Sequence, residues 1–136
     1  MDKLQKFANI IDLEKDEFIF ATRDNSDHFF FIIDGEVSIQ LFSYERGSIL
    51  LEVVKNGYLL GWSWLNPPYK WKFDALTDKK TKLIAFKAED IRNEMENDNG
   101  FGYRIQKIFM KIIIDRLQST RTRLLKEFGD NIYIPE

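Results

Sequence analysis

Apolar and polar residues alternate in short segments along residues 17–87. The clearest case begins at Val37, where Ile39 and Leu41 follow at every second position with polar residues between them. This period of two is typical of a strand with one buried face. Further apolar segments occur at residues 17–21, 28–33, 48–54, 71–77 and 81–86. Roughly seven or eight short strands at this spacing favour a sandwich or roll over an α/β sheet.

Turn-forming residues between these segments predict how the strands connect. Asp34-Gly35 is a strong hairpin signal, so we expect the strand at 28–33 to pair with the strand that follows it. Residues 45–47 predict another turn, after which the chain returns at 48–54. We expect residues 78–80 to join the last two strands as a pair.

The rest of the chain has the spacing of helices. Residues 88–98 form a short polar segment that ends at Asn97-Asp-Asn-Gly100, and a long apolar stripe follows over 101–128. Apolar residues recur there at intervals of three and four: Ile105, Ile108, Phe109, Ile112, Ile113, Leu117, Leu124, Leu125 and Phe128. Such a helix is about 40 Å long, and its stripe can lie on the roll, pack on a second copy, or do both.

We therefore expect a mainly β protein with C-terminal helices, organised as a single domain over residues 1–136. The β-roll covers about 14–87, and the helices cover about 88–98 and 101–128. A length of 136 residues fits one compact domain.

Composition excludes several kinds of chemistry. With no cysteine and His28 as the single histidine, the chain has no disulfide framework, thiol nucleophile, iron–sulfur site or multi-histidine metal site. We expect no catalytic residues, metal or cofactor, and no enzyme activity. A net charge of −2 gives no general attraction to DNA or RNA. There is no long apolar run and no signal-peptide core after Met1-Asp2-Lys3, so we expect a cytoplasmic protein without membrane contact.

Residues 57–75 hold all three tryptophans and the Pro67-Pro68 pair, which favours a loop or bulge over a central strand. The side chains of interest are the aromatics Trp62, Trp64, Tyr69 and Trp71 and the cations Lys70 and Lys72. Rigid aromatics with polar tips are typical of ligand-site walls, and they equally suit a plug between sheet and helix. Either lysine could meet an anion or simply extend into solvent.

Three segments in order resemble the cyclic-nucleotide-binding domain family of the catabolite-activator type. They are Leu13-Glu-Lys-Asp-Glu-Phe-Ile-Phe-Ala21, then Phe30-Phe-Ile-Ile-Asp-Gly-Glu-Val37 after a break with Asp27, and Gly57-Tyr-Leu-Leu-Gly61. The resemblance extends through the two terminal helices. It implies a cyclic-nucleotide-binding-like β-roll (a jelly roll, or double-stranded β-helix) with a phosphate-binding cassette, followed by helices of which the last usually forms a dimer.

The cassette departs from the family pattern. Gly61 and Ala75 align, but Trp62 stands where the family's glutamate holds the ribose, and Phe73 stands where an arginine takes the cyclic phosphate. Lys72 is one position away, points to the opposite side of an extended strand, and lacks the two-pronged geometry of arginine. Cyclic AMP or GMP would thus bury its phosphate without a partner, so we expect another ligand.

The resemblance implies a non-enzymatic, stand-alone regulatory or sensor module for signal transduction, working as a homodimer through the long helix. A partner protein would read a shift of that helix. The expected ligand-binding residues are Gly61, Trp62, Ser63, Trp64, Tyr69, Lys70, Trp71, Lys72, Phe73, Ser119 and Thr120. The alternative is a dimeric interaction module whose pocket is plugged by aromatics. Only eight residues follow Phe128, too few for a winged helix-turn-helix, so we expect no direct DNA binding.

Overall fold

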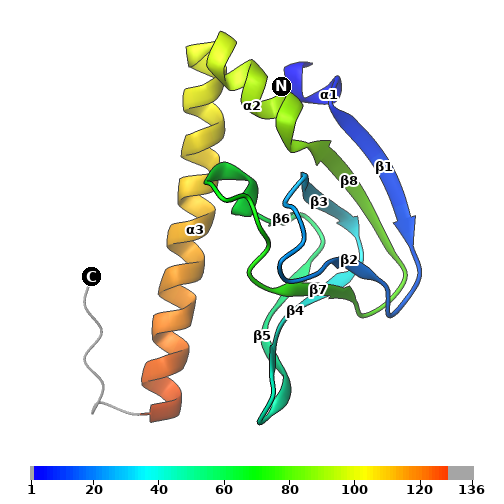
Figure 1. Ribbon diagram of the computed structural model, residues 1–136, viewed down its shortest axis with the longest axis vertical. Coiled ribbons are helices and arrows are strands. Elements are labelled where there is room, and N and C mark those ends of the chain that lie inside the picture. The colour runs from blue at the N-terminus through cyan, green and yellow to red at the C-terminus, as the bar shows by residue number, and fades with distance from the viewer. Residues whose placement is uncertain (1, 129–136) are drawn as a thin grey trace. The chain divides into compact units, whose positions relative to one another are not determined.

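The computed structural model describes residues 2–128 and divides into two compact units, Met1–Glu94 and Met95–Glu136. The first unit begins with a short helix and contains all the strands (Figure 1). Its elements are α1 (Asp2–Gln5), β1 (Ala8–Leu13), β2 (Phe18–Phe20), β3 (His28–Asp34), β4 (Glu36–Ser43), β5 (Gly47–Lys55), β6 (Leu59–Leu60), the 3-10 helix η1 (Ser63–Leu65), β7 (Asp74–Thr77) and β8 (Thr81–Lys87). Helix α2 (Ala88–Asn97) joins the two units, and α3 (Asn99–Phe128) makes up most of the second.

The strands form two four-stranded antiparallel sheets, ordered β1-β8-β3-β6 and β2-β7-β4-β5. Apolar residues from both sheets share one buried cluster, which includes Phe30 and Leu83 from the first sheet and Val37 and Ala75 from the second. The expected β-roll followed by a short and a long helix is therefore confirmed.

Two expected strand pairings are wrong. Strands β3 and β4 lie in different sheets, because the chain crosses from one sheet to the other at Gly35. The same holds for β7 and β8, which pair with β4 and β1 respectively. In both cases the inner faces of the strands complete the shared core. The turn at 45–47 is confirmed, since β4 and β5 form a long hairpin that extends away from the rest of the roll (Figure 1).

The β4–β5 hairpin carries exposed apolar side chains toward its tip. Phe42 packs edge-on against Tyr44 with ring centroids 5.4 Å apart, and Tyr44 is 98% exposed. Strand β5 is the last strand of its sheet, and among residues 2–128 it pairs with β4 alone.

Asp98 separates the two C-terminal helices. Its carboxylate accepts a hydrogen bond from the backbone N–H of Phe101 at 3.1 Å, and its carbonyl accepts one from Gly102 at 2.9 Å. A Cβ at Gly102 would lie 2.9 Å from the carbonyl oxygen of Met95, so the tight junction requires glycine. Helix α3 consequently begins at Asn99, two residues before the expected start.

Along α3, Phe101, Ile105 and Phe109 are buried, whereas the apolar side chains from Met110 to Leu125 are half-buried or exposed. Lys111 and Asp115 form an exposed ion pair at 2.8 Å, and this hydrogen bond together with the carboxylate charge raises the pKa of Lys111 above its usual value. Within residues 2–128, no helix is long and apolar enough to cross a membrane.

Candidate functional site

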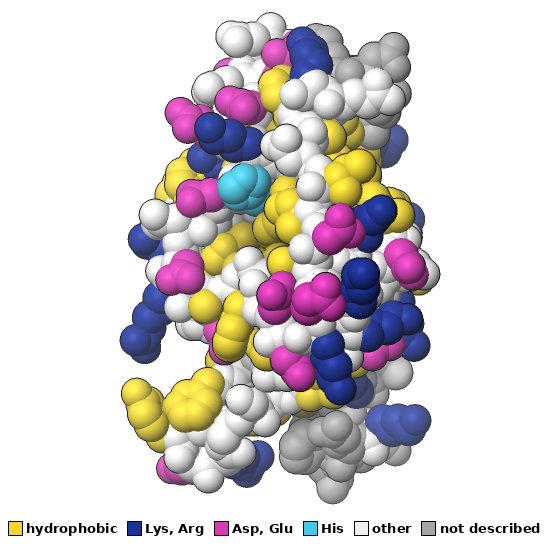
Figure 2. Space-filling model, turned by 90° about the vertical axis from the view of Figure 1, so that its right-hand side faces the viewer, with side chains coloured by type: hydrophobic (Ala, Val, Ile, Leu, Met, Phe, Trp, Pro, Cys, Tyr) yellow, Lys and Arg dark blue, Asp and Glu magenta, His cyan; other side chains and the backbone are white. Residues whose placement is uncertain are grey.

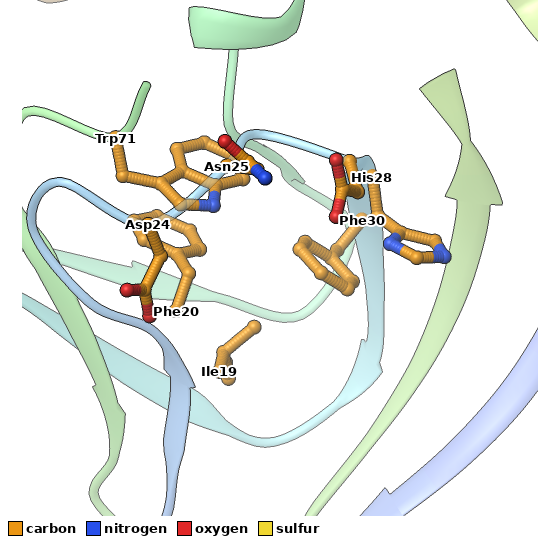
Figure 3. Close-up of a pocket in the computed structure, with 8 residues that line it drawn as sticks. Ile19, Phe20, Asp24, Asn25, His28, Phe30 and Trp71 are labelled. Atoms are coloured by element: carbon orange, nitrogen blue, oxygen red, sulfur yellow. The ribbon is translucent and has the colours of Figure 1, made fainter. Parts of the chain in front are cut away.

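A cavity of about 380 Å³ opens in the roll, within the unit Met1–Glu94. Four parts of the chain surround it: strand β2, the turn that leads into β3, the start of β3 itself, and the loop before β7. The lining residues are Ile19, Phe20, Asp24, Asn25, Asp27, His28, Phe30 and Trp71. Figure 3 shows Phe20 and Trp71 on one side of this space and Phe30 and His28 on the other. The volume lies within the range of small-molecule sites in proteins.

Stacked aromatic rings form the walls. The indole of Trp71 lies parallel to the ring of Phe20, with centroids 3.7 Å apart and 9° between the ring planes. On the other side, the imidazole of His28 stacks on Phe30 at 6.1 Å. Trp71 is 5% exposed, so it belongs to the hydrophobic core and to the cavity wall at once.

Backbone hydrogen bonds hold the polar rim of the cavity in place. The carbonyl of Asp24 accepts a bond from the N–H of Trp71 at 3.0 Å, and the carbonyl of Tyr69 accepts one from Ser26 at 2.7 Å. The ammonium of Lys70 donates to the side-chain oxygen of Asn25. Because residues 24–26 pair with residues 69–71, the turn and the loop move together.

The rim carries negative charge. Asp24 and Asp27 are exposed, and neither carboxylate forms an ion pair or hydrogen bond with the described part of the chain. Figure 2 shows the single histidine, His28, at the edge of a group of hydrophobic side chains with acidic side chains nearby. No three His, Asp or Glu side chains among residues 2–128 are arranged to hold a metal ion.

Trp71 also occupies the space beside the cassette glycine. A Cβ on Gly61 would lie 2.7 Å from the indole of Trp71, and Gly61 has a φ of +96°. The close approach of the indole and the positive φ therefore both favour glycine at this position. Ala75 is fully buried in β7, and Phe73 packs half-buried against the core cluster. The indole therefore fills the interior directly next to the predicted cassette.

Of the residues expected from the sequence to bind ligand, Trp71 lines this cavity and Lys70 bonds to its rim. The carbonyl of Tyr69 bonds to the same rim, and the other expected residues are not among those that line the cavity. Trp62 and Ser63 are half-buried, and Trp64 is buried against Phe29 with centroids 4.8 Å apart. Lys72 is exposed on the roll, while Ser119 and Thr120 are exposed on α3 in the other unit. For these residues a role in binding stays a prediction.

Sequence reasoning missed most of the lining. The polar turn at 22–27 and the aromatic strand after it were visible as structural elements, but no pattern links them to Trp71. The link is the isolated antiparallel bridge between Asn25 and Lys70, which pairs positions 45 residues apart in the chain.

The model of the family described as "Cyclic nucleotide-binding domain" matches residues 10–98. The chain belongs to this family. Among solved structures, a cyclic nucleotide-binding domain from Methylobacillus flagellatus KT superimposes with a TM-score of 0.84 at 15% identity, covering 96% of this chain and 74% of that one. No curated protein matches the chain.

Two longer regulators share the fold of this cyclic nucleotide-binding domain. CLP of Xanthomonas campestris, a global regulator described as responsive to c-di-GMP, has a TM-score of 0.80 at 16% identity. The catabolite activator protein of Thermus thermophilus has a TM-score of 0.71 at 17% identity. The domain covers 95% and 92% of its own length in these matches, and 64% and 58% of the two regulators. Identities this low show a common fold.

Proposed function

We propose that this cyclic nucleotide-binding domain is a non-enzymatic regulatory module that binds a small ligand other than cyclic AMP or GMP in the roll cavity. Occupancy of the cavity is transmitted through α2 to the C-terminal helix. Two features argue against a cyclic nucleotide. Trp62 and Phe73 stand in place of the family's polar anchors, and the indole of Trp71 lies against Gly61 where the cassette begins.

The observation that carries the proposal is the loop shared by the cavity and α2. Trp71 lines the cavity, and two residues earlier the ring of Tyr69 lies 4.4 Å from the guanidinium of Arg92 on α2. Arg92 also donates a hydrogen bond of 2.8 Å to the backbone carbonyl of Trp64. A displacement of Trp71 by ligand thus acts, through the neighbouring Tyr69, on Arg92, and α2 continues through Asp98 into α3.

Thermal unfolding against a ligand panel tests this function. The panel contains cyclic mono- and dinucleotides, nucleoside phosphates, haem, small acids and small amines. A ligand at one hundred times its dissociation constant adds about 2.7 kcal/mol. For a domain of this size the midpoint should then rise by roughly 5–10 °C. We expect a rise with at least one compound and none with cyclic AMP or GMP. A rise with cyclic AMP would contradict our interpretation of the cassette, and silence across the panel would favour the alternative below.

Arg92→Gln should loosen α2 without unfolding the roll. The variant removes a charge-assisted hydrogen bond and a cation–π contact, together worth about 1–3 kcal/mol. We expect amide hydrogen exchange in α2 to accelerate by about tenfold or more, because the helix opens locally more often. Arg46→Gln, in the turn of the β4–β5 hairpin, is the matched control and should leave α2 unchanged. Equal exchange in α2 for the wild type and Arg92→Gln would show that the arginine does not couple loop and helix.

The alternative function is a dimeric interaction module with a plugged pocket. The face-to-face stack of Trp71 on Phe20 favours it, because two core rings already fill that side of the roll. Apolar side chains of α3 are exposed at close to heptad spacing, which suits a helix pair between two copies. They are Met110, Ile114, Leu117 and Leu124. A stable dimer in analytical ultracentrifugation, together with a silent ligand panel, would select this function.

A further inference from the structure

The charges and rings around the roll cavity point to the chemical class of its ligand. We propose that the cavity takes a small organic cation, with an ammonium or amidinium group at Asp24 and Asp27 and an apolar ring against the aromatic walls. This inference rests on the proposed function, because it assumes that the cavity is the ligand site.

The carboxylates on the rim supply the attraction. Asp24 and Asp27 stand near the two ends of one turn, both line the cavity, and both lack an ion-pair partner among residues 2–128. Lys70 does not line the cavity, and its ammonium donates to the amide oxygen of Asn25. The lining residues therefore carry two negative charges and no lysine or arginine. A phosphate or carboxylate ligand would meet like charge at this mouth.

The walls suit the same ligand. The faces of aromatic rings are electronegative and attract cations, and tryptophan does so most strongly. Phe20, Phe30 and Trp71 present rings from three different segments. A flat apolar body can pack against them while its charged end remains at the rim. The volume of about 380 Å³ admits a ligand with one or two rings.

A bare metal ion is a poorer candidate, because the described side chains form no three-ligand group.

The test uses three probes of similar size that carry different charges. Phenethylamine, 2-phenylethanol and phenylacetate each have a phenyl ring followed by two carbon atoms. At neutral pH they are positive, neutral and negative respectively. Binding is followed by the NMR shift of the Trp71 indole N–H, assigned with Trp71→Phe. We expect phenethylamine to bind about tenfold more tightly than 2-phenylethanol, and phenylacetate to bind most weakly. An ion pair at a partly exposed site contributes about this much to the binding free energy. The preference should shrink as salt is added.

Asp24→Asn and Asp27→Asn should each weaken phenethylamine binding by about three- to tenfold and leave 2-phenylethanol unchanged. Asp12→Asn, an exposed carboxylate on β1 away from the cavity, is the matched control and should change neither. The inference is overturned if phenylacetate binds as well as phenethylamine, if the two rim variants bind all probes like the wild type, or if no probe moves the Trp71 signal.

The larger ligand panel separates this failure from failure of the proposed function. If the three probes are silent while a nucleotide or an acid raises the unfolding midpoint, the cavity binds a ligand of another class. Lys70 or Lys72 then becomes the anion contact expected from the sequence. If no probe shifts the Trp71 signal and no compound in the panel raises the unfolding midpoint, the proposed sensor function is contradicted as well.

Discussion

Replacing Gly35 with alanine should destabilise the domain more than any other single methyl group added to a glycine of the roll. Gly35 has a φ of +148°, which side-chain-bearing residues rarely adopt, and a Cβ there would lie 2.3 Å from Oγ1 and 2.6 Å from Cβ of Thr81. Thr81 is 1% exposed, and its hydroxyl donates to the carbonyl of Lys79 at 2.8 Å, so it cannot move aside. Backbone strain and overpacking together should lower the free energy of unfolding by about 2–5 kcal/mol.

Gly57→Ala is the matched control for this measurement. Gly57 also has a positive φ, +85°, but a Cβ there meets nothing within 4 Å. The Gly57→Ala variant should lose about 1 kcal/mol of unfolding free energy, because it has the backbone strain of a positive φ without a steric clash. Both variants are compared by urea unfolding, followed by circular dichroism. Equal losses would mean that Thr81 yields, and that the crossing between the sheets is less tightly packed than the structure shows. Failure of Gly35→Ala to fold, with Gly57→Ala folded, is the extreme form of the expected result.

Trp71→Ala should cost about 3–5 kcal/mol, the usual range for truncating a buried aromatic residue. The indole is 5% exposed, stacks on Phe20 at 3.7 Å and fills the space over Gly61. Its removal leaves a void beside the ring of Phe20 and also removes one wall of the roll cavity. Stability is measured by urea unfolding at a concentration where the oligomeric state is constant.

Trp62→Ala is the control for Trp71→Ala, since it removes the same side chain from a half-buried position in the same loop. We expect Trp62→Ala to lower the free energy of unfolding by less, on the order of half as much. The half-buried Trp62 side chain removes less apolar surface from water when the protein folds. A loss at Trp62 equal to that at Trp71 would show that the loop before β7 contributes as a unit, and that Trp71 has no special place in the core.

Much of the fold was predictable from the sequence because it depends on short-range patterns. Alternation at Val37, Ile39 and Leu41 located β4, and the intervals in 101–128 located α3 to within two residues. The departures from the family cassette at Trp62 and Phe73 could also be identified directly from the sequence. These features require only the period of a strand or helix and the identity of individual side chains.

Strand pairing was predicted less well, for a physical reason. A turn signal such as Asp34-Gly35 reports that the chain changes direction, but hairpin and sheet-to-sheet crossing use the same residues. The choice was decided by burial. The inner faces of β3 and β4 contribute to one core from opposite sheets, where each strand pairs with strands distant in the sequence. Such long-range packing leaves no local mark in the sequence.

The sequence by itself determined most of the elements, the family and the absence of cysteine and multi-histidine chemistry. It did not reveal strand β1 (Ala8–Leu13), which precedes the expected start of the roll at residue 14. The tertiary structure alone decided where the roll cavity lies. The cavity joins Asp24 and His28 to Trp71, residues far apart in the chain, through backbone bonds between the polar turn and the loop before β7. It also decided that Trp71 serves both core and wall. Each of these facts depends on which segments meet in space, and contact between distant segments follows from the packing of the whole roll.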